Sequence, residues 1–91
     1  MKDITLIIPA KNESESLPIV LENLEKFNFK ILVVLHKTDK KTINSIKKFK
    51  KKIIYQNDKG YGDALIQGIN NCKSRFFCIF NADGSFRPKE I

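Results

Sequence analysis

The chain has 91 residues, a hydrophobic content of 42% and a formal net charge of +7 at pH 7. This length allows one small domain with a single core, and the apolar content argues against a disordered chain. No apolar run approaches the ~18 residues of a membrane span. The N-terminus lacks the apolar region of a signal peptide, so a cytoplasmic protein is expected. Cys72 and Cys78 fit neither a Cys-x-x-Cys site nor a disulfide framework and are interpreted as buried hydrophobes.

The first half of the chain contains two apolar runs, each followed by an amphipathic segment. The run 4–8 predicts a buried strand that ends at Pro9, because proline cannot donate to a sheet ladder. A helix is expected to begin near Ser16, with an apolar face of Leu17, Val20, Leu21, Leu24 and Phe27. A second strand at 31–35 precedes a helix capped by Thr38 or Asp39, whose inner face is Ile43, Ile46 and Phe49.

The second half repeats this alternation. A short strand at 53–55 precedes a helix that Gly60-Tyr61-Gly62-Asp63 opens, with Leu65, Ile69 and Cys72 expected inside and Ala64 and Gly68 allowing close packing. The run 76–80 predicts a fourth strand, buried on both faces. The order βαβαβαβ predicts a single α/β domain over residues 1–91, Rossmann-like, with three αβα layers and a mostly parallel sheet of about four strands.

In such a sheet the loops after residues 8, 35, 55 and 80 share one edge, where open α/β sheets bind ligands. Residues 9–13 offer groups that would read a nucleobase or ribose, although Asn12 would equally serve as a helix cap. Gly60 and Gly62 would let backbone approach a phosphate. Leu65 stands where a dinucleotide fingerprint needs its third glycine, so no NAD site is inferred. His36, the only histidine, is interpreted as a polar loop residue.

Asp83 follows the fourth strand within Asn81-Ala82-Asp83-Gly84-Ser85. A carboxylate in this place is a hard oxygen ligand of the kind that Mg²⁺ or Mn²⁺ prefers. The alternative is an ordinary turn after a strand, because Asn, Asp, Gly and Ser all favour turns.

The excess charge is concentrated in residues 37–52, which hold eight lysines and a single acid, Asp39. The functional interpretation is attraction to phosphate, either of a nucleic acid or of an anionic membrane surface. The simpler interpretation, which we prefer, is the solvated face of one amphipathic helix, because no Arg is interleaved with these lysines and the single aromatic, Phe49, belongs to the expected inner face. A nucleic-acid partner is therefore not expected.

Three segments together resemble family-2 glycosyltransferases over the whole chain, and most closely the dolichyl- or polyprenyl-phosphate sugar transferases. They are residues 4–13 (ITLIIPAKNE), residues 59–69 (KGYGDALIQGI), and Asn81–Ser85 with Arg87-Pro88. The resemblance implies the first half of a GT-A fold, a UDP- or GDP-linked sugar donor and a divalent metal, Mg²⁺ or Mn²⁺.

The resemblance also implies roles for individual residues. Those that match the segment around the donor base and ribose are Pro9, Ala10, Asn12 and Glu13, while Gly60 and Gly62 match the turn beside the nucleotide. Asn81 and Asp83 occupy the two acidic positions of the Asp-x-Asp motif, which binds the metal and the diphosphate. Asn81 is a neutral ligand where the family usually has Asp, so weaker metal binding is expected.

A second departure follows the second strand, where the family usually reads Asp-Asp-Gly-Ser-Thr-Asp. This chain reads Leu35-His36-Lys37-Thr38-Asp39-Lys40, so the carboxylate that reads the base is absent unless Asp39 is its displaced remnant. The alternative hypothesis, a non-catalytic nucleotide-binding or interaction module derived from such an enzyme, rests on this departure and on Asn81.

The expected function is therefore the nucleotide-binding portion of a transferase that moves a sugar to a polyprenyl phosphate or glycan acceptor. The acceptor and catalytic half is expected to be missing, so the 91 residues alone should be inactive and no catalytic base is assigned. The lysines of residues 37–52 would place the protein at the inner face of an anionic membrane. An open sheet edge would permit a homo-oligomer.

Overall fold

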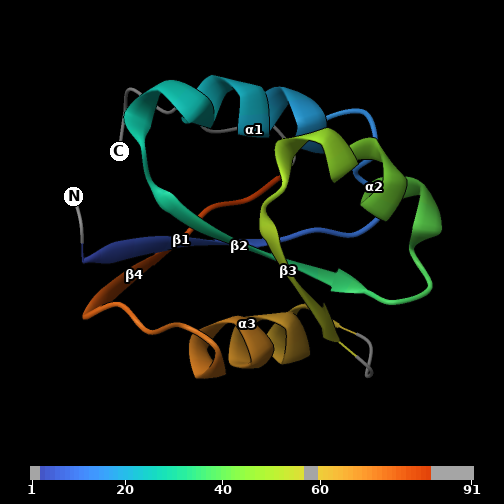
Figure 1. Ribbon diagram of the computed structural model, residues 1–91. Coiled ribbons are helices and arrows are strands. Elements are labelled where there is room, and N and C mark those ends of the chain that lie inside the picture. The colour runs from blue at the N-terminus through green and yellow to red at the C-terminus, as the bar shows by residue number, and fades with distance from the viewer. Residues whose placement is uncertain (1–2, 57–59, 83–91) are drawn as a thin grey trace.

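The computed structural model describes residues 3–56 and 60–82, which form a parallel four-stranded sheet in the order β3-β2-β1-β4. Helices α1 and α2 cover one face and α3 covers the other (Figure 1). The predicted α/β, Rossmann-like architecture is confirmed. The elements are β1 Ile4–Pro9, α1 Leu17–Leu24, η1 Glu25–Phe27, β2 Lys30–His36, α2 Lys40–Ser45, η2 Lys47–Phe49, β3 Lys52–Gln56, α3 Tyr61–Asn70 and β4 Phe76–Ile79, where η marks a 3-10 helix.

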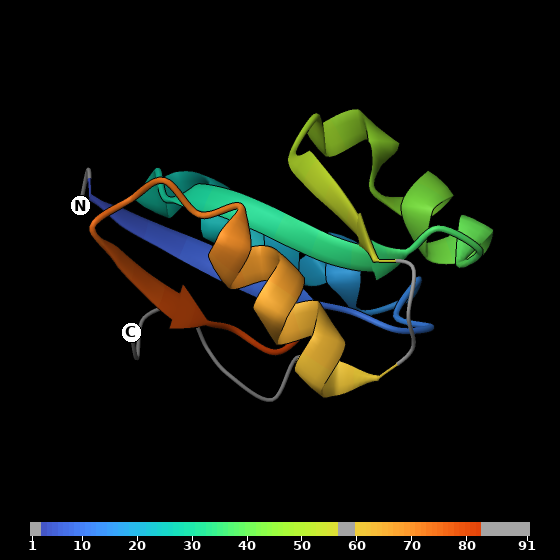
Figure 2. The same cartoon turned by 90° about the horizontal axis from the view of Figure 1, so that it is seen from below.

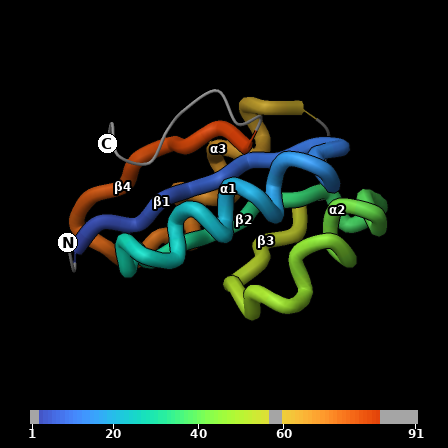
Figure 3. The backbone as a smooth tube through the Cα atoms, turned by 90° about the horizontal axis from the view of Figure 1, so that it is seen from above, coloured from blue at the N-terminus to red at the C-terminus, as the bar shows by residue number. Residues whose placement is uncertain are grey.

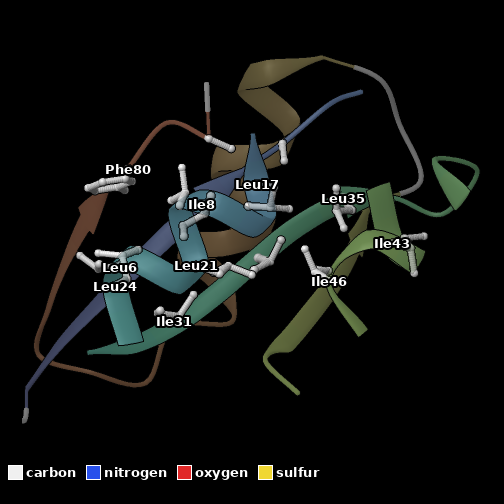
Figure 4. Packing of buried hydrophobic residues seen from close by; sticks show 14 residues of the cluster. Leu6, Ile8, Leu17, Leu21, Leu24, Ile31, Leu35, Ile43, Ile46 and Phe80 are labelled. Atoms are coloured by element: carbon white, nitrogen blue, oxygen red, sulfur yellow. The ribbon is translucent and has the colours of Figure 1, made fainter. Parts of the chain in front are cut away.

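The main core lies between α1 and the sheet (Figure 4). Ser16 occupies the N-cap position of α1 and Pro18 lies in the first turn, where its missing N–H has no intrahelical partner to lose. The buried face of the helix is Leu17, Val20, Leu21 and Leu24, as predicted, whereas Phe27, predicted for the same face, lies in η1 and is half-buried. Full burial of a leucine side chain contributes about 1.5–3 kcal/mol.

Helix α3 lies across one face of the sheet (Figure 2), and its buried residues are small. Ala64 and Gly68 are the buried residues of α3, and a Cβ added at Gly68 would lie 2.4 Å from Ile7 Cγ2. The prediction that Leu65 and Ile69 form the inner face is wrong, since Leu65 is half-buried and Ile69 is exposed. Once Ala64 and Gly68 bring the helix axis close to the sheet, the larger neighbouring side chains lie beside the contact.

Strand β4 is an edge strand, which corrects the prediction that residues 76–80 are buried on both faces. Phe76 and Phe77 are 57% and 46% exposed and Cys78 is also exposed, whereas Phe80 is buried in the α1-side core. The interpretation of Cys78 as a buried hydrophobe is therefore wrong; Cys72 is half-buried. β4 pairs with β1 along one side, so its outer side has no neighbour among residues 3–56 and 60–82.

The lysine-rich segment does not form the single amphipathic helix that sequence analysis predicted. Helix α2 ends at Ser45, and Ile46, with φ −115°, separates it from η2. Ile43 and Ile46 are buried as expected, but the lysines are divided between the start of α2 and the approach to β3. Figure 3 shows α1 and α2 side by side over the sheet. Within the described residues no helix is both long and apolar enough to span a bilayer.

Candidate functional site

The carboxyl ends of β1, β2 and β3 and the first turn of α3 surround a cleft of about 760 Å³. Its volume lies within the range of about 300–1,000 Å³ that is usual for small-molecule sites. The side chains and backbone segments that line it are Pro9, Ala10, Lys11, Asn12, His36, Thr38, Asp39, Lys40, Lys41, Gln56, Gly60, Tyr61 and Ala64. The edge of the sheet at which sequence analysis predicted a site therefore contains a ligand-sized cleft.

Asp39 joins the loops that follow β1 and β2. As N-cap of α2 it accepts a hydrogen bond from the Thr42 N–H at 3.5 Å through Oδ1, and its Oδ2 accepts from the Asn12 N–H at 2.8 Å. Glu13 N–H donates to Thr42 Oγ1 at 3.1 Å, which adds a second link between the same segments. Asn12 has φ 55°, a left-handed conformation that Asn tolerates better than most residues. These contacts set the position of the β1–α1 loop at the cleft.

His36 lies at the end of β2 and contributes to the cleft wall. Its Nδ1 accepts from the Thr38 N–H at 3.2 Å and lies 2.7 Å from Thr38 Oγ1. Because a ring nitrogen that accepts from a backbone N–H carries no proton, the neutral imidazole has its proton on Nε2. His36 and Asp39 therefore place an imidazole and a carboxylate in the same loop at the wall of the cleft.

Gln56, buried at the end of β3, holds the entry to α3. Its Nε2 donates to Gly60 O at 3.3 Å and to Asp63 Oδ2 at 3.0 Å. Gly60 has φ 106°, which L side chains rarely adopt, so a glycine is needed at this turn. Asp63 lies in the first turn of α3, as expected of a carboxylate that complements the helix dipole.

The segment after β4 is tied to both helical layers. The Tyr61 hydroxyl donates to Asn81 Oδ1 at 3.2 Å. Ser16 Oγ lies 2.6 Å from Ala82 O and also contacts the Glu13 carboxylate, so its single proton has two acceptors within reach. Through these contacts α1 and α3 hold residues 81 and 82 in place. Asp83 lies outside the described residues.

The predicted site residues divide into two groups. Pro9, Ala10, Asn12 and Gly60 line the cleft together. Glu13, Gly62 and Asn81 do not line the cleft. Glu13 contacts Ser16 and Thr42, Gly62 is exposed on α3, and Asn81 accepts a hydrogen bond from Tyr61, which lines the cleft. Their roles stay predictions.

Several cleft residues were not among the predicted site residues, namely Lys11, His36, Thr38, Asp39, Lys40, Lys41, Gln56, Tyr61 and Ala64. All of them follow or end a strand at the carboxyl edge, or begin α3, and this placement is the signal that would have identified them. Within residues 3–56 and 60–82, no group of three His, Cys, Asp or Glu side chains has the arrangement of a metal site.

Comparison with known proteins identifies the family. The model of the family described as Glycosyl transferase family 2 matches residues 5–91. The chain belongs to this family. Among solved structures, the mannosyl-3-phosphoglycerate synthase from Rubrobacter xylanophilus superposes with a TM-score of 0.83 over 97% of this chain and 33% of its own, at 16% sequence identity. This similarity shows the fold and confirms the predicted GT-A architecture.

Two relatives illustrate how much of a family member the chain represents. A Methanococcus voltae protein named dolichyl N-acetyl-alpha-D-glucosaminyl phosphate 3-beta-D-2,3-diacetamido-2,3-dideoxy-beta-D-glucuronosyltransferase is 35% identical over 94 residues, covering 90% of this chain and 29% of its own length. An uncharacterized glycosyltransferase of Mycobacterium tuberculosis is 28% identical over 97% of this chain and 40% of its own. The chain thus spans well under half the length of these family-2 relatives.

Proposed function

We propose that this chain is the nucleotide-binding portion of a family-2 glycosyltransferase and that its cleft holds the nucleoside of a nucleotide-sugar donor. The observation that carries the proposal is the convergence of Pro9, Ala10, Asn12 and Gly60 on one cleft at the carboxyl ends of the strands. The family match favours this function over the alternative of a non-catalytic module.

The chemistry of the cleft suits a base and a ribose. Pro9, Ala10 and Ala64 supply apolar surface for a planar ring, and Thr38 and Asp39 supply polar groups beside it. Each Asp39 oxygen accepts one backbone N–H, and a carboxylate has about four lone-pair sites, so Asp39 retains capacity for a ligand hydroxyl or imino group. Asp39 thereby takes the place of the carboxylate that the family usually carries after its second strand.

Asn81 and Asp83 are the residues that we propose hold a divalent metal. Their amide and carboxylate oxygens are the hard ligands that Mg²⁺ and Mn²⁺ prefer, and Asn81 Oδ1 has a second lone pair beyond the one that Tyr61 engages. When bound, the metal would neutralise charge on the leaving nucleoside diphosphate. With one carboxylate in this pair, an Asn81→Asp variant should bind Mn²⁺ more tightly, as calorimetry can measure.

The acceptor is proposed to be a polyprenyl phosphate or a related glycan, in line with the dolichyl-linked substrate that the name of the Methanococcus voltae relative states. The chain carries no assigned catalytic base, and we expect the purified 91 residues to bind donor without transferring sugar. Turnover of a nucleotide sugar onto a lipid or glycan acceptor by this chain would contradict that expectation.

Calorimetric titration of the purified chain with UDP, GDP and their sugar conjugates, with and without Mn²⁺, tests the proposal. Binding of at least one nucleotide is expected, strengthened by the metal. Thr38→Trp, which fills the cleft from an exposed position, should weaken it by about tenfold or more, equivalent to 1.4 kcal/mol. Asn44→Trp is the matched control, since Asn44 is exposed on α2 and does not line the cleft. Equal loss in both variants, or no nucleotide binding, would overturn the proposal.

A further inference from the structure

A second hollow, of about 380 Å³, lies at the opposite end of the sheet from the cleft. Lys30 begins β2, Lys52 begins β3, and Lys73 follows α3, so the three lysines that line the hollow come from separate elements. Among the residues that the structure describes, no acidic one lines it. Only Lys52 belongs to the lysine-rich segment that dominated the charge pattern, so this cluster is a feature of the folded chain.

The register of the sheet explains why these lysines converge. Lys30 pairs with Thr5, and Lys52 pairs with Leu32. Lys30 and Leu32 are two residues apart and therefore face the same side as Val34, which packs in the α3-side cluster. Helix α3 ends at Asn70, and the chain that follows it brings Lys73 to the amino-end part of the same sheet face.

Two hydroxyl side chains, Thr5 and Ser74, also line the hollow. Thr5, only 4% exposed, has its Oγ1 2.6 Å from Ser74 Oγ, and both residues line the hollow. One hydroxyl donates to the other, so the second proton of the pair is left for a further acceptor. Three ammonium groups and a hydroxyl donor around one space form a set that is complementary to an anion with several oxygen acceptors.

Neutralisation of these charges by residues 3–56 and 60–82 does not account for the cluster. Within the described part of the chain, none of the three lysines forms an ion pair with a carboxylate; the ion pair found there joins Lys51 and Glu25. Lys73 lies just beyond the C-terminus of α3, where a cation complements the helix dipole. That explanation does not extend to Lys30 and Lys52, which come from strands.

We propose that this hollow is an anion site for a phosphate group, distinct from the nucleotide cleft. The shared chemistry is a phosphate oxygen cluster held by Lys30, Lys52 and Lys73, whether it comes from free phosphate or from a phospholipid headgroup.

Titration of the ¹⁵N-labelled chain with inorganic phosphate and pyrophosphate at low salt tests the site. The amide signals of the lining residues should shift, those of Lys30, Lys52 and Ser74 included. Replacing all three lysines with glutamine should weaken binding by about fivefold for each lysine removed. The matched control replaces Lys26, Lys47 and Lys48, which carry the same charge on exposed positions outside the hollow.

Sedimentation with vesicles of phosphatidylcholine, alone or equimolar with phosphatidylglycerol, distinguishes the two sources. Shifts with free phosphate and no selective vesicle binding assign a soluble anion, whereas binding to anionic vesicles that needs the three lysines assigns a headgroup. An equal loss of phosphate affinity in the two triple variants would show that the anion is attracted by the net charge of the chain, and this would overturn the site. Absence of binding in both arms would overturn it as well. Circular dichroism confirms that the variants, all at exposed positions, stay folded.

Discussion

The two ends of the same parallel sheet differ in how their polar groups are used. At the carboxyl end, side chains link segments that are distant in the sequence: Asp39 reaches the loop after β1, Ser16 reaches Ala82, and Tyr61 reaches Asn81. At the amino end the Thr5–Ser74 pair and the Lys51–Glu25 ion pair also join distant segments, but the lysines of the hollow lack acidic partners in the described chain.

This difference separates two kinds of site. The links at the carboxyl end hold its loops in one arrangement, which a cleft needs if it is to recognise a base and a ribose by shape. The amino end presents positive charge on exposed side chains, which suits an anion held by charge with little demand on orientation. The cleft should therefore be sensitive to single hydrogen bonds and the hollow to the number of lysines.

The largest effect is expected from a change that displaces α3, because this helix begins at the cleft and ends at the hollow and so contributes to both ends of the sheet. Gly68→Leu would force a side chain against Ile7 and Val34, and overpacking of this kind costs about 1–3 kcal/mol or more. We expect a loss of that size in the free energy of unfolding, measured with urea. Gly62→Ala is the control, since a Cβ there meets nothing within 4 Å, and it should leave stability unchanged or slightly raised. Equal destabilisation by both would show that close packing at Gly68 does not position α3.

The next effect should be confined to the carboxyl end. Asp39→Ala removes the N-cap of α2 and the acceptor for the Asn12 N–H, and loss of a cap typically costs about 1 kcal/mol. We expect a loss of about 1–2 kcal/mol in urea unfolding, together with weaker nucleotide binding. Asp3→Ala, at an exposed acid near the amino end, should cost little. If Asp3→Ala lowered the free energy of unfolding as much as Asp39→Ala, the two ends of the sheet would not differ in this way.

Part of this fold could be predicted from the sequence and part could not. The strands, their order along the chain and the shared carboxyl edge could be predicted, because β-branched apolar runs and helical spacing are local patterns. The exposure of Phe76 and Phe77 could not be predicted, because an apolar run has the same sequence pattern in a central strand and in an edge strand. Strand order depends on tertiary packing, which one strand's residues do not encode.

The candidate site was predicted only in part, for a similar reason. Pro9, Ala10, Asn12 and Gly60 lie in recognisable motifs. Asp39 is 27 residues from Asn12 in the chain, and their hydrogen bond exists only once the β1–α1 and β2–α2 loops meet. The motif alignment is ambiguous at Asp39, whereas in the fold Asp39 is one of the residues that line the cleft.

A smaller effect should follow removal of one exposed link at the carboxyl end. Tyr61→Phe deletes the hydroxyl that donates to Asn81, at a cost of about 0.5 kcal/mol, because a neutral hydrogen bond open to water contributes little. The sharper readout is the side-chain amide signal of Asn81 in a ¹H–¹⁵N spectrum, which should move in Tyr61→Phe. An unchanged Asn81 signal would argue that Tyr61 does not orient this amide.

The smallest effect is expected at the amino end. Lys51→Gln removes the 3.5 Å ion pair with Glu25, whose side chain is 49% exposed, and solvent-exposed pairs contribute about 0–1 kcal/mol. We expect a change within about 0.5 kcal/mol in thermal or urea unfolding, similar to that of the neighbouring Lys50→Gln. A loss approaching that of Asp39→Ala would show that this end also depends on specific side-chain links.

The most direct test of the central claim is a ¹H–¹⁵N titration of the chain with UDP and GDP in the presence of Mg²⁺. The account predicts that at least one of them shifts the amides of residues 10–12, 36–41, 56 and 60–64, and that Thr38→Trp weakens the affinity read from these shifts by about tenfold or more. It would be contradicted if neither nucleotide moved the cleft signals, including the case in which the only shifts fell on Lys30, Lys52 and Ser74 at the opposite end of the sheet.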